Sequence, residues 1–176
     1  ILAPAMRFLA GELRKHLDKL SHLMKDYSAF VSRLSYERLS QAVTITKTDI
    51  KEFYMSRTQG VLLGQSNKSF QGGHQRRFTR VLELIVGHQH VELPGVPEYL
   101  WEVLHGSGMG MICSGDVSDG TFFQLAEQQC ISDVDVFRSV WLRCYSQLKD
   151  DITAFFDGPN QQRNRCFTML SLRAGP

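Results

Sequence analysis

Apolar residues recur at steps of three and four positions through the first 34 residues of the chain. They are Met6, Leu9, Leu13, Leu17, Leu20, Met24, Tyr27, Val31 and Leu34. Such spacing places side chains on one face of an α-helix. It predicts one amphipathic helix, or two helices broken near Lys25-Asp26. The opposite face is charged; we interpret its basic residues as solvated, with contact to phosphate as the less favoured alternative.

Two later parts of the pattern are typical of strands. The β-branched residues 42–48 predict a central strand that ends at Asp49. Apolar residues on both sides of Asp150-Asp151 predict a hairpin over residues 140–156 with this acidic pair at its turn. The strand that enters the turn is expected to extend over residues 135–147.

The rest of the pattern predicts shorter elements joined by turns. In chain order they are a helical turn at 36–40, a polar loop at 56–73, an amphipathic helix at 78–86, a hairpin with strands at 88–92 and 98–104, a glycine-rich loop at 106–110, a helix capped by residues 114–116, and a final helix at 161–172. Helices and hairpins therefore alternate along the chain, which indicates an α+β protein.

Composition narrows the class of protein. The chain has 176 residues, 43% of them hydrophobic and 22% charged, which suits one globular domain with its own core. A net charge of +2 does not by itself indicate nucleic acid, although basic residues cluster at 7–19 and 76–80. No run is long and apolar enough to span a membrane, and no signal peptide is visible. The chain starts at Ile1 rather than Met, so we expect it to be a piece of a longer protein.

Cysteine and histidine usage gives little support to a metal site of the zinc type. The four cysteines are widely spaced without a Cys-x-x-Cys pair, which favours free thiols in a reducing, intracellular compartment, either nucleus or cytoplasm. His88, His90 and His105 lack a fourth ligand at fixed spacing, so a histidine-bound metal is the less favoured interpretation.

Acidic residues carry the main candidate chemistry. Asp150 and Asp151 place two like charges side by side between apolar strands, which is costly unless a cation neutralises them. Mg²⁺ prefers carboxylate oxygen, and Asp49 supplies a third carboxylate at the end of another strand. Three such aspartates can hold two metal ions for phosphoryl transfer. The alternative is a solvated surface turn, where adjacent aspartates are common.

The loop Gly106-Ser107-Gly108-Met109-Gly110 is a second candidate, because three glycines in five positions let backbone approach a ligand closely. It opens a helix, so it either binds phosphate or merely turns the chain. It lacks the Lys-Ser/Thr pair of a P-loop and does not fit the dinucleotide-binding fingerprint.

Taken together and in order, these motifs resemble the palm of reverse transcriptases, and most closely those of Penelope-like retroelements. The resemblance covers nearly the whole chain. It rests on the stretch Lys25-Asp26-Tyr27-Ser28-Ala29-Phe30, the first aspartate motif Thr48-Asp49-Ile50-Lys51-Glu52-Phe53-Tyr54, the loop from Gly106 to Ser114 with its Gly-x-x-Met-Gly pattern, and the box Leu148-Lys149-Asp150-Asp151. Gly115 stands where the family usually has Pro, and Leu148 where it usually has Tyr or Phe.

The resemblance implies a fold and a division of the chain. The fold is an α+β polymerase palm, with an antiparallel sheet of three or four strands flanked by helices that pack on one face. Residues 1–41 would be a helical segment on the fingers side, and residues 42–176 the catalytic palm. The basic fingers motif and the thumb would lie outside residues 1–176, so the isolated chain is expected to be inactive or nearly so.

The resemblance also implies an activity, the transfer of a deoxynucleotide to a primer 3′-hydroxyl. Asp49 and Asp150 would hold two Mg²⁺ ions, with Mn²⁺ as a substitute, and Asp151 would contribute less directly. The expected partners are an RNA template, a DNA primer and dNTP, without a membrane; the oligomeric state stays open. The chain implies no particular host element, priming mode or attached endonuclease.

Further residues receive roles from the same resemblance. Tyr54 would lie under the sugar and select deoxynucleotides by clashing with a ribose 2′-hydroxyl. The other expected nucleotide-binding residues are Ile50, Lys51, Glu52 and Phe53 along the triphosphate, and Gly108, Met109, Gly110 and Ser114 around the nucleotide pocket. The expected nucleic-acid contacts are Lys149, Gly106 and Ser107.

Three alternatives stay open. In an RNA-dependent RNA polymerase palm an acidic residue usually stands at the position of Tyr54, which argues against that class. The intact set of aspartates argues against an inactive nucleic-acid-binding remnant. A different metal-dependent phosphotransferase leaves the Gly-x-x-Met-Gly loop unexplained.

Overall fold

A computed structural model describes residues 2–37, 43–70, 72–108, 110–131 and 133–174. The chain divides into two compact units, each assembled from two separate stretches. Unit 1 consists of Ile1–Lys19 and Glu52–Gln124, and unit 2 of Leu20–Lys51 and Leu125–Pro176. Helices and small antiparallel sheets are both present, which confirms the α+β class. The expected division near residue 42 concerns the parts of a polymerase and stays a prediction.

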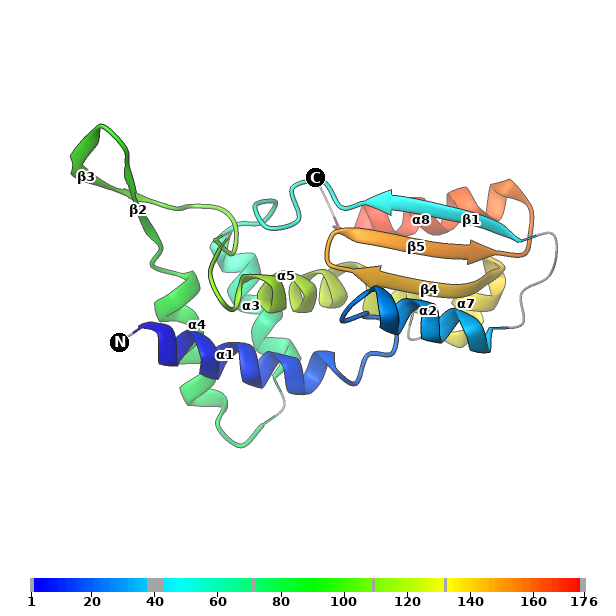
Figure 1. Ribbon diagram of the computed structural model, residues 1–176, viewed down its shortest axis with the longest axis horizontal. Helices are drawn as coiled ribbons and strands as arrows, with labels where there is room; N and C mark the ends of the chain where they lie inside the picture. The colour runs from blue at the N-terminus through cyan, green and yellow to red at the C-terminus, as the bar shows by residue number, and fades with distance from the viewer. Residues whose placement is uncertain (1, 38–42, 71, 109, 132, 175–176) are drawn as a thin grey trace. The chain divides into compact units, whose positions relative to one another are not determined.

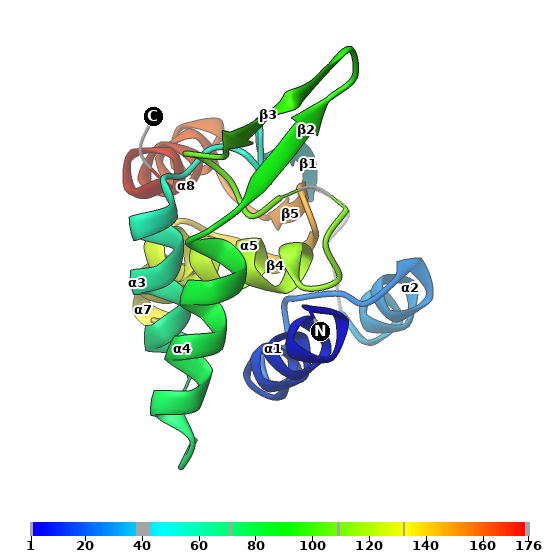
Figure 2. The ribbon, with the colours of Figure 1, turned by 90° about the vertical axis from the view of Figure 1, so that its left-hand side faces the viewer.

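Unit 1 is built mainly of helices. They are α1 (Leu2–Leu17), α3 (Gln59–Ser69), α4 (Gln75–Val86) and α5 (Ser114–Phe122). The apolar face of α1 buries Leu9 and Leu13 where the helix packs against α4 and α5. Figure 2 shows α3 and α4 side by side. The rings of Phe70 and Phe78 stack, with 4.4 Å between their centroids. These apolar contacts form the core of the unit.

The helix α3 corrects one expectation from the sequence, because residues 56–73 were predicted to be a polar loop. Thr58 caps this helix by accepting a hydrogen bond from the backbone N–H of Val61 at 3.4 Å. Leu62, Ser66 and Ser69 are its buried residues. Spacings of four and three positions place these small and apolar side chains on one face, so a helix forms despite the polar composition.

A hairpin follows α4, as predicted, with shifted bounds. Its strands are β2 (His90–Leu93) and β3 (Val96–Glu102), with a register shift between Glu92 and Leu93. Gly95 occupies the turn in a left-handed conformation, with φ of 87°. Figure 1 shows the hairpin continuing from the end of α4. Most of its large apolar side chains, including Trp101, are exposed.

Unit 2 is organised around a three-stranded antiparallel sheet (Figure 1). The strands are β1 (Thr44–Asp49), β4 (Leu142–Leu148) and β5 (Asp151–Phe156), in the order β1-β5-β4. The expectation that residues 43–49 and 140–156 share one sheet is confirmed. The helices of the unit are α2 (Tyr27–Tyr36), α6 (Gln128–Ile131), α7 (Val134–Ser139) and α8 (Asn160–Ala174); the π-helical turn η1 (Phe123–Glu127) precedes α6.

Helices lie on both faces of this sheet, so the expected packing on one face is wrong. Phe156 meets Phe167 of α8, with ring centroids 5.8 Å apart. Its neighbour Phe155 lies 6.4 Å from Phe30 of α2. Successive residues of a strand point to opposite faces, which places α8 and α2 on opposite sides.

Two further boundaries differ from, or refine, the sequence prediction. Residues 134–139 form the helix α7 rather than the start of a strand, because Asp133 caps it by accepting from the N–H groups of Asp135 and Val136. The apolar periodicity of the first 34 residues forms two helices, α1 and α2, which confirms the second of the two predictions. Asp26 caps α2 by accepting a hydrogen bond from Ala29 N–H at 2.8 Å. The helical turn expected at 36–40 lies mostly outside the described residues.

Candidate functional site

The acidic pair lies at the turn between β4 and β5. Leu148 pairs with Asp151, so Lys149 and Asp150 form a two-residue turn. Lys149 adopts a left-handed conformation, with φ of 57°, which tight hairpin turns require. The side-chain amide of Gln147 donates a hydrogen bond to the Lys149 carbonyl at 2.7 Å and so fixes the backbone of the turn.

The strand β1 brings the third aspartate to the same end of the sheet. Asp49 is paired directly opposite Asp151 in the antiparallel register. The backbone N–H of Ile50 donates to the carbonyl of Asp150 at 2.7 Å, which ties the end of β1 to the turn. Directly opposed residues project from the same face. Asp49 and Asp151 therefore share one face, next to Asp150.

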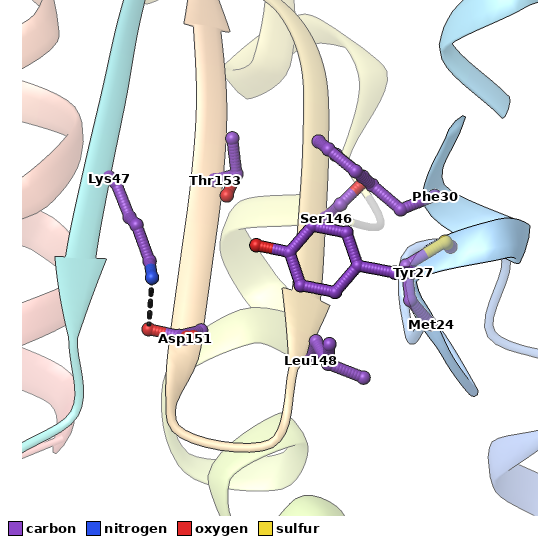
Figure 3. Close-up of a pocket in the computed structure, with 8 residues that line it drawn as sticks. All are labelled: Met24, Tyr27, Phe30, Lys47, Ser146, Leu148, Asp151 and Thr153. Carbon is purple, nitrogen blue, oxygen red and sulfur yellow. Dashed lines mark ion pairs between the residues drawn. The ribbon is translucent and has the colours of Figure 1, made fainter.

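A lysine that the sequence did not point to completes this face. Lys47 Nζ lies 3.0 Å from Asp151 Oδ1. Figure 3 marks this ion pair with a dashed line. The hydrogen bond and the charge of Asp151 raise the pKa of Lys47 above its usual value. Strand alternation alone places residues 47 and 49 on one face, but only the register of β1 with β5 sets Lys47 beside the acidic turn.

The arrangement fits a divalent cation in donor chemistry and in register. Carboxylate oxygens are the ligands that Mg²⁺ prefers, and Asp49, Asp150 and Asp151 are the residues that would hold it. Within the described parts of the chain, no group of three His, Cys, Asp or Glu side chains is already close enough to hold a metal ion. A cation would also share Asp151 with Lys47.

A pocket opens on the same sheet face, between the strands and the start of α2 (Figure 3). Apolar side chains from α2 and the segment before it form one wall, and polar side chains of the strands form the other. Its lining consists of Met24, Tyr27, Phe30, Lys47, Ser146, Leu148, Asp151 and Thr153. The pocket thus adjoins the acidic turn directly.

A buried polar cluster supports the sheet within unit 2. Tyr145 of β4 donates a hydrogen bond to Glu127 Oε1 at 2.6 Å, and His22 Nε2 lies 3.0 Å from Glu127 Oε2. Glu127 and Tyr145 are fully buried. Burial, followed by the nearby Glu127 charge, raises the pKa of Tyr145 well above its usual value. In the sequence, the signal for this cluster is limited to the polar residues Glu127 and Tyr145, each of which stands within an apolar run.

The same cluster is connected to the strand that enters the acidic turn. The His22 carbonyl accepts from Gln147 N–H at 2.8 Å, and Met24 N–H donates to the Gln147 carbonyl at 2.8 Å. The segment around Leu23 thereby extends the edge of β4. Residues 22–24 thus hold the backbone of Gln147, and the Gln147 side chain in turn holds the acidic turn.

Tyr54 and the glycine-rich loop come together in unit 1. The Tyr54 carbonyl accepts a hydrogen bond from Ser107 N–H at 2.8 Å, and Gly106 N–H donates to the Arg57 carbonyl at 2.7 Å. A Cβ atom on Gly106 would lie 2.6 Å from the Tyr54 carbonyl oxygen, so glycine is required there. Tyr54 and the start of this loop are therefore in direct backbone contact.

Several expected contact residues of the loop face inward. Ser107 is fully buried, and its hydroxyl lies 2.9 Å from that of Ser118. Ser114 is also buried and donates to the Met111 carbonyl at 2.9 Å. Gly108 and Gly110 have left-handed backbones, with φ of 75° and 94°. Met109 lies outside the described residues. Backbone groups of this loop, rather than the two serine hydroxyls, are what a ligand could meet.

The stretch after Asp49 turns sharply. Lys51 and Glu52 are exposed, and Glu52 is left-handed with φ of 53°. Phe53 is buried, with its ring 5.1 Å from that of Tyr54 and 6.4 Å from that of Phe122. Phe53 therefore anchors the turn and offers a ligand only its backbone.

Comparisons with known proteins identify no family for this chain, so its function is argued from its own residues. A scan against models of protein families and a search among curated proteins each returned no match. Among the helices that the structure describes, none combines the length and the apolar character needed to cross a bilayer.

Proposed function

We propose that this chain is the palm region of a reverse transcriptase of the Penelope-like kind, which joins deoxynucleotides to a primer 3′-hydroxyl under the direction of an RNA template. One observation carries the proposal. Asp49 at the end of β1 stands opposite Asp151 of β5, beside a two-residue turn that presents Asp150. The register thus brings Asp49 to the same end of one antiparallel sheet as the Asp150-Asp151 pair, which lies about a hundred residues later in the sequence.

The aspartates have separate roles in this proposal. Asp49 and Asp150 hold the metal ions, and Asp151, partly neutralised by Lys47, contributes less directly as the third ligand. Two bound Mg²⁺ ions supply neutralisation of the primer oxygen and of the triphosphate. Gln147 and Ile50 N–H fix the backbone of the turn, so only the carboxylate side chains would have to move together around the metal ions.

The remaining residues position the nucleotide and the primer. Backbone groups of residues 50–53 lie along the triphosphate, and Tyr54 excludes a ribose 2′-hydroxyl. The Gly106–Gly110 loop lets the templating base approach closely, and Lys149 approaches the primer end. Tyr54 is held through its carbonyl by Ser107, which supports a fixed position for the residue that selects the sugar.

Primer extension tests the proposal, in a chain that includes the fingers and thumb expected beside residues 1–176. Asp150→Asn is expected to reduce extension of a DNA primer on RNA by about 1,000-fold or more, because the variant removes a negatively charged ligand that both metal ions would share. Asp135→Asn, at an exposed carboxylate on α7, is the matched control and should extend like the parent. Circular dichroism checks that both variants fold.

Retained extension by Asp150→Asn would overturn the assignment. The nearest alternative is an RNA-dependent RNA polymerase palm, and the same assay with rNTP in place of dNTP separates the two. The Tyr54 ring predicts dNTP incorporation in the parent. A preference for rNTP would transfer the assignment to that alternative.

A further inference from the structure

Unit 1 carries a group of exposed arginines that the proposed chemistry does not use. We call Arg7 of α1 and Arg76, Arg77 and Arg80 of α4 the arginine patch; all four side chains belong to exposed residues. The guanidinium carbon of Arg77 lies 4.7 Å from the centroid of the Phe8 ring, which joins the two helices at this point. A guanidinium held over an aromatic ring keeps its N–H edge directed to solvent.

The patch is short of compensating negative charge. Arg80 is 3.7 Å from Glu83, an exposed pair of the kind that contributes little. Within the described residues, Arg7, Arg76 and Arg77 form no ion pair with a carboxylate. The first turn of α4 contains no acidic residue. Like charges kept together without partners are unfavourable, so an external anion would stabilise them.

Arginine chemistry and the scarcity of exposed large apolar side chains on α1 and α4 favour nucleic-acid phosphate as that anion. Guanidinium groups bind phosphate oxygens in a bidentate manner. A membrane surface would need apolar side chains that enter the lipid beside the basic ones. Phe78 of α4 is fully buried, and among the described residues of α1 and α4 the exposed large apolar side chains are Leu2 and Leu84, one on each helix. Two isolated leucines do not form the continuous apolar face that a membrane surface requires.

We propose that the arginine patch is a second nucleic-acid contact surface, which binds the phosphate backbone of an RNA–DNA hybrid without reading its bases. That the anion is such a hybrid rests on the proposed function; the charge of the patch does not. The patch belongs to unit 1, whereas the three aspartates belong to unit 2. The two sites can therefore be changed independently.

Salt-dependent binding tests the patch. Fluorescence anisotropy would follow the 176-residue chain binding a labelled RNA–DNA hybrid between 50 and 200 mM salt. Arg7→Gln/Arg76→Gln leaves the Arg77–Phe8 contact intact and should weaken binding about tenfold or more at 50 mM. It should also reduce the slope of log K against log salt by about 1.8, because each lost phosphate contact removes about 0.9.

A control of equal charge separates the patch from net charge. Arg138→Gln/Arg165→Gln removes two exposed arginines of unit 2 and should leave the salt slope unchanged. Arg7→Lys/Arg76→Lys keeps the charge and should retain most of the slope, which excludes misfolding as the cause. An unchanged slope in Arg7→Gln/Arg76→Gln, or an equal loss of slope in the control, would overturn the proposal. Binding of the same variants to phosphatidylserine vesicles is measured in parallel. If Arg7→Gln/Arg76→Gln lost vesicle binding but kept hybrid binding, the proposal would also be overturned.

The patch and the polymerase assignment fail in different ways. Asp150→Asn should leave hybrid binding by the patch unchanged. If Arg7→Gln/Arg76→Gln weakened hybrid binding and Asp150→Asn still extended a primer, the arginine patch would be supported and the polymerase assignment would be wrong. If Arg7→Gln/Arg76→Gln left hybrid binding unchanged and Asp150→Asn abolished extension, the polymerase assignment would be supported and the arginine patch would be wrong.

Discussion

At the scale of single residues, Lys47 is the side chain that modifies the acidic turn most directly. It reaches from β1 to Asp151 across the strand pair, and the pKa of Lys47 is raised by that contact. Both side chains remain accessible to water, so the pair contributes little to folding stability. Its consequence is local, because Lys47 occupies a carboxylate oxygen that a metal ion would otherwise use.

Replacing Lys47 should therefore strengthen metal binding. Lys47→Met keeps most of the aliphatic stem and removes one positive charge near the carboxylates. We expect Mn²⁺ to bind about 30-fold more tightly, the effect of removing one positive charge about 4 Å from a divalent ion in a water-like medium. Electron paramagnetic resonance of free Mn²⁺ during titration measures the affinity.

The control for this change is Lys68→Met, at an exposed lysine on α3 in unit 1. It should leave Mn²⁺ affinity unchanged. If the two variants bind Mn²⁺ equally, then Lys47 does not compete for the acidic turn, and the ion pair with Asp151 has no bearing on the metal.

The aspartates themselves could be predicted from the sequence, whereas Lys47 could not. Asp49 and Asp150-Asp151 stand at the ends of recognisable apolar runs, so their positions follow from local pattern. The contact of Lys47 with Asp151 depends on strand register, which is set by pairing over a hundred residues apart. The inward direction of Ser107 likewise follows from its contact with Ser118, which composition does not reveal.

At the scale of elements, the buried cluster around Glu127 holds β4 to the segments on either side of it. The Tyr145 hydroxyl donates to Glu127, and its pKa is raised well above 10 by burial and by that carboxylate. Tyr145→Phe would leave Glu127 with one partner fewer inside the unit. A lost hydrogen bond to a buried carboxylate costs about 2 kcal/mol, so the melting temperature should fall by about 4–8 °C.

The pH dependence of this loss has a definite sign. Because the folded pKa of Tyr145 lies above the unfolded value of about 10, its contribution is present below pH 10 and declines as pH rises beyond it. The difference between parent and Tyr145→Phe should therefore shrink above pH 10. Thermal melts from pH 7 to 11 measure it, with the exposed Tyr36→Phe as control; identical melts of Tyr145→Phe and parent at pH 7 would contradict the role of the cluster.

Elements with strong apolar periodicity were predictable, and those that depend on a cap and on packing were not. The pattern predicts α1, α4, β1 and the β4–β5 hairpin, which the structure contains. It misses α3 and α7, because Gly, Ser and Asn interrupt the apolar pattern of α3, and α7 is short and rich in valine and aspartate. Thr58 and Asp133 start these two helices, and contacts of α3 with α5 and of α7 with β4 sustain them.

At the scale of the whole chain, neither unit is continuous in sequence. Unit 1 and unit 2 each combine an early and a late stretch, so the order of elements gives the α+β class but not the partition. Periodicity reports which face of an element is buried, and it does not report which distant element covers that face. The carboxylates and the loop with Tyr54 could thus be named from motifs, while their assignment to different units could not.

Binding by the whole chain should be strongly dependent on salt and independent of base sequence. A polymerase accepts any template, so its contacts go to phosphate and sugar rather than to base edges. If the 176-residue chain contacts about four phosphates, its affinity for an RNA–DNA hybrid should fall roughly 150-fold between 50 and 200 mM salt. The net charge of +2 keeps the affinity modest even at the lower salt.

Two hybrids of equal length and unrelated sequence, titrated at both salts, measure this. Their dissociation constants should agree within about threefold, because the A-like shape of a hybrid and its phosphate spacing do not depend on sequence. A B-form DNA duplex of one of the two sequences is the control for shape, and it should bind more weakly. A tenfold preference for one hybrid, or binding that salt does not alter, would contradict binding by a polymerase palm and would point to an RNA-binding module that reads bases.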